Sequence, residues 1–176
     1  YLARYYLRRG QLARAVEVLD ESRQLVLKHG LRGFLCVPTW VSLAQARLAI
    51  AENADALDRE PALRSARQAC KVALEQGRLD CAHLVIAYRL QGGCEWLAGK
   101  PGGAREWWRR SQELAKGLGA RYELGMTCLE IGRWLREPAP LEEAAAIFEE
   151  LGAQFDLAQA RGLLEEVSKR AFAAPP

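Results

Sequence analysis

The chain has 176 residues, half of them hydrophobic, which suffices for one packed domain or one run of small repeats. The chain has 25 basic and 22 acidic residues, and this net charge of +3 does not by itself imply a nucleic-acid partner. Apolar runs fall short of the roughly 18 residues that a membrane helix needs, and five cysteines exclude a complete disulfide framework. We therefore expect a cytoplasmic protein with reduced thiols and no membrane segment.

The first residue is Tyr1, and Met126 is the only methionine. Leu2, Tyr5 and Tyr6 already have helical spacing, and no charged segment followed by an apolar core indicates a signal peptide. We therefore expect the chain to be a piece of a larger polypeptide.

Apolar residues recur at helical spacing along almost the whole chain, and the alternation typical of strands is nearly absent. Good helix formers dominate, while glycine and proline fall between the periodic runs. In chain order, the pattern predicts helices over residues 2–9, 12–29, 38–52, 61–77, 80–98, 102–117, 120–136, 140–151 and 155–171.

The predicted helices form pairs with a repeated register, because a small residue recurs where two antiparallel helices would have to cross. In the second helices these residues are Ala15, Ala66, Ala104 and Ala144, each followed four positions later by Leu19, Cys70, Trp108 or Phe148. The small residues of the first helices are Ala3, Ala44, Gly92 and Gly132. A third position of the register lies three residues after each bulky residue and is filled by Ser22, Ala73, Ser111 and Leu151. Stacked pairs of this kind bury one continuous core. The units are residues 1–33, 38–78, 80–118 and 120–152, with a closing helix over 155–171 and about ten extra residues near Asn53.

This register resembles the tetratricopeptide repeat, whose opening W-x2-L-G is matched by Trp40, Leu43 and Ala44. Its period, nearer 40 residues, is similar to that of the sensor repeats in signal-transduction ATPases and maltose-regulator-like transcription activators. The resemblance implies an all-α fold, a right-handed superhelical stack of about four antiparallel helix pairs plus a closing helix. It also implies a non-enzymatic interaction and sensor segment of a larger bacterial-type signalling or transcription regulator.

The sequence has no residue pattern with the spacing that a known catalytic or cofactor-binding motif requires. The segment from Gly93 to Lys100 has five residues between its glycines, and Pro101 stands where a phosphate loop needs Ser or Thr. The two histidines are far apart, and neither a CxxC nor a G-x-S-x-G motif occurs. We therefore expect no enzymatic activity, no cofactor and no metal.

In the tetratricopeptide resemblance the first helices line a concave groove. The positions projected onto that groove include five arginines, which can bind carboxylate or phosphate with paired hydrogen bonds, and a tryptophan that offers an apolar platform. The predicted groove residues are Arg4, Arg8, Gln45, Arg89, Trp96, Arg133 and Arg136. They favour an acidic peptide, a partner domain or a small-molecule effector as ligand, although arginine is abundant along the whole chain.

Two alternatives stay open at this point. The same arginines with exposed aromatic residues could bind nucleic acid. The first helix, which lacks a preceding cap, could instead pair with a second copy of the chain to form a homodimer.

Overall fold

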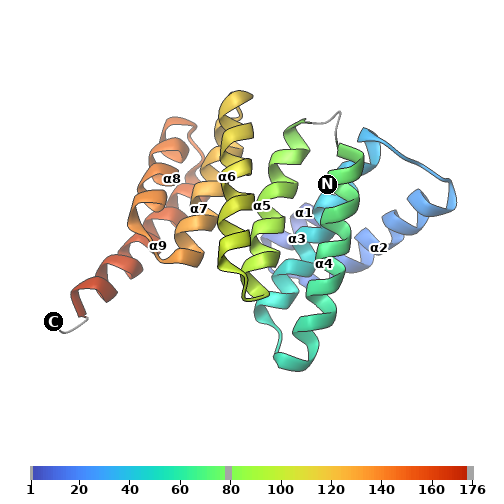
Figure 1. The fold of residues 1–176 in the computed structure, drawn as a ribbon, viewed down its shortest axis with the longest axis horizontal. Helices are drawn as coiled ribbons and strands as arrows, with labels where there is room; N and C mark the ends of the chain where they lie inside the picture. The colour runs from blue at the N-terminus through green and yellow to red at the C-terminus, as the bar shows by residue number, and fades with distance from the viewer. Residues whose placement is uncertain (1, 78–80, 174–176) are drawn as a thin grey trace. The chain divides into compact units, whose positions relative to one another are not determined.

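All regular elements in the described part of the chain, residues 2–77 and 81–173 of a computed structural model, are helices (Figure 1). The predicted all-α class is therefore confirmed. The chain divides into two compact units, Tyr1–Trp107 and Trp108–Pro176. The elements are α1 (Leu2–Arg8), α2 (Leu12–Lys28), the 3₁₀ turn η1 (Phe34–Cys36), α3 (Val37–Asn53), α4 (Ala56–Gln76), α5 (Cys81–Leu97), α6 (Pro101–Gly117), α7 (Arg121–Leu135), α8 (Pro138–Glu150) and α9 (Gln154–Ala173).

Unit 1 contains α1 to α5 and the first part of α6. Each of its helices from α1 to α5 packs against the next in the chain, and α3 also contacts both α1 and α5. Figure 1 shows α3, α4 and α5 side by side. Of these helices α3 gives the most residues to the shared core, among them Trp40, Leu43 and Leu48.

Unit 2 contains the rest of α6 and helices α7 to α9, with α8 packed against both α7 and α9. Gly125 and Gly132 lie on the face of α7 that meets α8, where a Cβ atom at either position would touch Phe148 or Leu141. Glycine is required at this crossing because the two backbones approach too closely for a side chain.

The predicted repeat register describes the burial in both units. Ala15, Ala66, Ala104 and Ala144 are all 0% exposed. The bulky residues four positions later, Leu19, Cys70, Trp108 and Phe148, are also buried. The positions predicted as helix crossings are therefore core positions.

The third position of the register adds a polar contact between helices. The hydroxyl of Ser22 lies 3.3 Å from that of Thr39, and the hydroxyl of Ser111 lies 2.9 Å from that of Thr127. Each pair joins a second helix to the first helix that follows it. The other two residues at this position make no such contact. Ala73 is buried but has no polar side-chain atom, and Leu151 caps the end of α8 and is exposed.

The start of α4 differs from the prediction, which placed it at residue 61. The helix begins at Ala56, and Pro61 lies inside it. Asp55 caps it by accepting hydrogen bonds from the backbone N–H groups of Leu57 and Asp58, a contact that stabilises a helix start. The extra residues of the second pair therefore mostly lengthen α3 and α4. The expected junction of the second and third units, residues 78–80, and residue 1 lie outside the described residues.

Candidate functional site

Five of the seven predicted groove residues belong to unit 1. Arg4 and Arg8 are exposed on α1, and Gln45 is exposed on α3. On α5, Trp96 is half-buried, whereas Arg89 is only 6% exposed. Four of these residues are therefore open to a ligand, while Arg89 lies in the interior of the unit.

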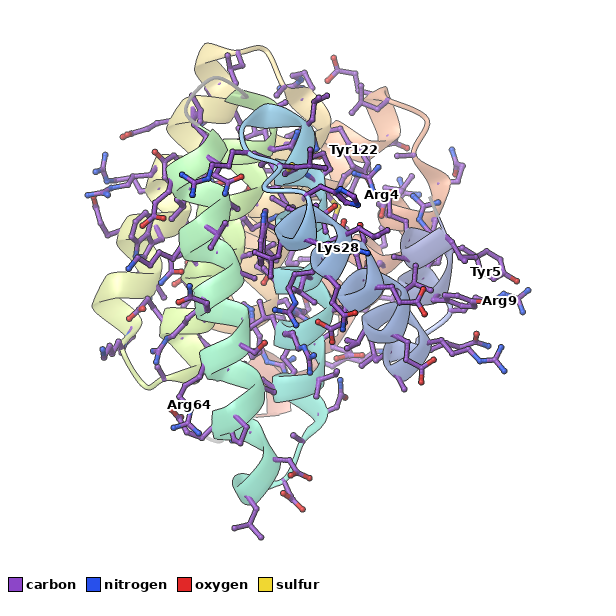
Figure 2. All side chains as sticks on the ribbon, turned by 90° about the vertical axis from the view of Figure 1, so that its right-hand side faces the viewer. Arg4, Tyr5, Arg9, Lys28, Arg64 and Tyr122 are labelled. Atoms are coloured by element: carbon purple, nitrogen blue, oxygen red, sulfur yellow. The ribbon has the colours of Figure 1, made fainter. Side chains whose placement is uncertain are left out.

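The groove prediction did not include a pair formed by a residue of α1 and a residue of the turn after it. Tyr5 and Arg9 project side by side (Figure 2), with the Arg9 guanidinium carbon 5.3 Å from the centre of the Tyr5 ring. Together with Arg4 and Arg8, this pair makes the short helix α1 and the turn after it strongly basic.

The remaining two predicted residues, Arg133 and Arg136, belong to α7 and the turn after it, in unit 2. The guanidinium of Arg133 lies 4.6 Å from the centre of the Trp134 ring and 3.5 Å from a carboxylate oxygen of Glu130. Arg136 has a left-handed backbone (φ 57°) and lies 3.9 Å from a carboxylate oxygen of Glu166. Both arginines thus have acidic neighbours within their own unit.

A cavity of about 430 Å³ opens in unit 1, on surfaces that the groove prediction did not include. Its walls come from α4, α5 and α6, and the residues that line it are Arg67, Lys71, Leu74, Glu75, Gln91 and Trp107. Arg67, Lys71 and Leu74 are spaced i, i+4 and i+7 on α4, so they share one face of that helix. This spacing is visible in the sequence, but the groove prediction considered first helices only.

Glu95 links the residues around this cavity. Its Oε1 atom accepts a hydrogen bond of 3.1 Å from the Gln91 amide and lies 3.8 Å from Nη2 of Arg67. Its Oε2 atom lies 3.9 Å from the ammonium of Lys100. Another lining residue, Trp107, has its ring 5.7 Å from the Tyr88 ring, tilted by 33°.

The thiols Cys36, Cys70, Cys94 and Cys128 are buried. A hydrogen bond with Cys94, together with desolvation, raises the pKa of Cys70 well above its usual value. Desolvation raises the pKa of Cys128 to about 11, although its contact with the Gln112 amide opposes this shift. Both thiols therefore stay protonated at neutral pH and are poor nucleophiles.

Among residues 2–77 and 81–173, no group of three or more His, Cys, Asp or Glu side chains could hold a metal ion. No helix in this part of the chain combines the length and hydropathy needed to cross a bilayer. Comparison with protein families, with curated proteins and with solved structures found no match to this chain.

Proposed function

We propose that this chain is a non-enzymatic interaction and sensor segment of a larger signalling or transcription regulator, and that it binds an acidic peptide segment of a partner protein. The proposed architecture is a tetratricopeptide-like, right-handed superhelical stack of helix pairs. One observation supports it above the others: α3 contacts both α1 and α5, so that first helices of consecutive pairs adjoin one another in unit 1. In stacked helix pairs, such adjoining helices form a continuous binding wall.

The side chains on this wall suit an acidic peptide. Arg4 and Arg8 are exposed on α1 and can each hold a carboxylate with two hydrogen bonds. Gln45 can both donate to and accept from an extended backbone. Trp96 adds apolar surface. Arg89 is too deeply buried for direct contact.

Within unit 2, the first helix α7 and the turn after it carry the corresponding arginines. Arg133 and Arg136 already lie near Glu130 and Glu166. Because such partly exposed ion pairs are weak, they can exchange their carboxylate partner for one from a peptide.

The test measures fluorescence anisotropy of a labelled peptide in which Asp or Glu alternates with aromatic residues. We expect R4Q/R8Q to weaken its binding about tenfold, since two charge-assisted contacts are lost. The matched control R14Q/R32Q removes two other exposed arginines of unit 1 and should change the affinity less than about twofold. Circular dichroism checks that both variants keep their helicity.

Equal losses for the two double variants would show that only net charge matters and would refute the wall. So would equal affinity for the same peptide with Asn and Gln in place of its acids. Binding of single-stranded RNA or DNA with a steep salt dependence, without peptide binding, would replace this proposal by a nucleic-acid function.

A further inference from the structure

We infer that the cavity lined by α4, α5 and α6 of unit 1 is a binding site for a small aromatic carboxylate, that is, a planar apolar ring carrying one negative charge. A volume of about 430 Å³ lies in the range of small-molecule sites. Trp107 and Leu74 give this cavity apolar surface, and its four other lining residues are polar or charged. Small-molecule sites use apolar surface for affinity and placed polar groups to orient the ligand.

The guanidinium of Arg67 is the group that would hold the carboxylate. Its Nε and Nη2 atoms are buried and have no hydrogen-bond partner among the residues that the structure describes. A carboxylate oxygen of Glu95 lies 3.8 Å from Nη2, which is longer than a hydrogen bond. Buried donors without acceptors are costly, so a ligand carboxylate that reorients this side chain and accepts from it would relieve that cost.

Arg67 can turn toward a ligand at little cost to its neighbour. Glu95 would keep the hydrogen bond from Gln91 at 3.1 Å and the ammonium of Lys100 at 3.9 Å. The carboxylate of Glu95 therefore stays compensated when Arg67 changes partner.

The ring of the ligand would lie against Trp107 and Leu74. The tilted contact of Trp107 with Tyr88, at 5.7 Å, holds the indole in place before binding. A preformed aromatic wall lowers the entropy that binding must overcome, and aromatic rings stack favourably on one another.

The acidic residues restrict the ligand to a single negative charge. Lys71 lies at the rim, 68% exposed and 3.9 Å from Glu75, so this pair is weak and its ammonium can turn to the ligand. Glu75 and Glu95, however, both flank the cavity and would repel a second or third charge. This balance favours a carboxylate over a polyphosphate or a nucleic acid.

The site uses none of the residues of the proposed peptide wall. Its failure would leave the peptide proposal intact, and failure of the peptide proposal would leave this site intact.

The experiment titrates phenylacetate, phenylacetamide and acetate into the full chain by isothermal calorimetry, and follows the Trp107 indole N–H by NMR after its assignment with W107F. We expect phenylacetate to bind at least about tenfold more tightly than the amide, which lacks the charge, and than acetate, which lacks the ring. Binding should shift the Trp107 signal.

The variant R67Q should lose about tenfold in affinity for phenylacetate. Its matched control is R64Q, since Arg64 is an exposed arginine one turn earlier on the same helix (Figure 2) and does not line the cavity. The control should bind as the native chain does. If R67Q proves unfolded by circular dichroism, K71Q replaces it, because Lys71 is exposed, with an expected loss of about threefold.

Three outcomes would overturn the inference. The first is equal affinity for phenylacetate and phenylacetamide, and the second is an equal loss of affinity in R67Q and R64Q. The third is the absence of both heat and a Trp107 shift at roughly 5 mM phenylacetate. At that concentration a site of even millimolar affinity is mostly filled.

Discussion

Replacing Gly132 by alanine should destabilise unit 2, although alanine is the better helix former. A Cβ atom at this position of α7 would lie 2.4 Å from Cγ, 2.7 Å from Cδ2 and 3.1 Å from the backbone nitrogen of Leu141. Carbon atoms normally approach to about 3.5–4.0 Å. Leu141 is 0% exposed and cannot swing into solvent, so α7 and α8 must separate.

The net magnitude follows from two opposing effects. Overpacking costs about 1–3 kcal/mol, and the upper end applies here because a backbone atom is among the contacts. The higher helix propensity of alanine offsets part of this cost, because alanine stabilises a helix by about 1 kcal/mol relative to glycine. We therefore expect a loss of about 2 kcal/mol, or roughly 4–8 °C in Tm for a chain of this size.

The assay is urea and thermal unfolding followed by circular dichroism, with G162A as the matched control. Gly162 lies in α9, and a Cβ atom there would have no neighbour within 4 Å, so the same substitution should stabilise the chain by about 0.5–1 kcal/mol. In the double variant G132A/L141A, the smaller side chain makes room for the new methyl group, and the two losses should be less than additive. Equal effects of G132A and G162A, or strict additivity in the double variant, would refute the reasoning.

Two further predictions concern a helix start and a buried thiol. The variant D55A removes the oxygen that caps α4 and should lower the free energy of unfolding in urea by about 1 kcal/mol. D55N keeps a capping oxygen and should lower it less, so equal losses in the two variants would contradict a capping role. The folded pKa of Cys128 is raised from 9.0 to about 11, so the folded chain keeps a proton that the unfolded chain releases. Its stability should therefore fall as the pH rises from 9 to 11, by up to about 1.4 kcal/mol per pH unit. In C128A this fall should be smaller, and an unchanged pH dependence of the urea midpoint would argue against the shifted thiol.

The peptide and carboxylate proposals can be examined in one set of proteins. R4Q/R8Q should impair only peptide binding, and R67Q should impair only phenylacetate binding. Loss of binding to both ligands in either variant would point to a general change in the fold rather than to two separate sites.

The helical class and the burial of the recurring small residues could be predicted from the sequence alone. Both depend on local spacing, and a small residue at Ala15, Ala66, Ala104 and Ala144 is visible without coordinates because closely packed helices accept little else. All four residues are fully buried, as that argument requires.

The first turn of α4 could not be predicted in the same way. The prediction began this helix at Pro61, because glycine and proline separate the periodic runs along the chain. The cap at Asp55 outweighs that signal, and the helix continues through the proline.

Exposure and the assembly of the cavity depend on tertiary packing. The groove prediction included both Arg89 and Arg4, yet Arg89 is buried and Arg4 is exposed, because what covers each side chain comes from other helices. Likewise, Arg67 and Trp107 are 40 positions apart in the sequence, and only the packing of α4, α5 and α6 brings them to the same cavity. Local spacing therefore determined which residues form helices and which face of each is apolar, while contacts between distant segments decided which charges meet solvent and which line a site.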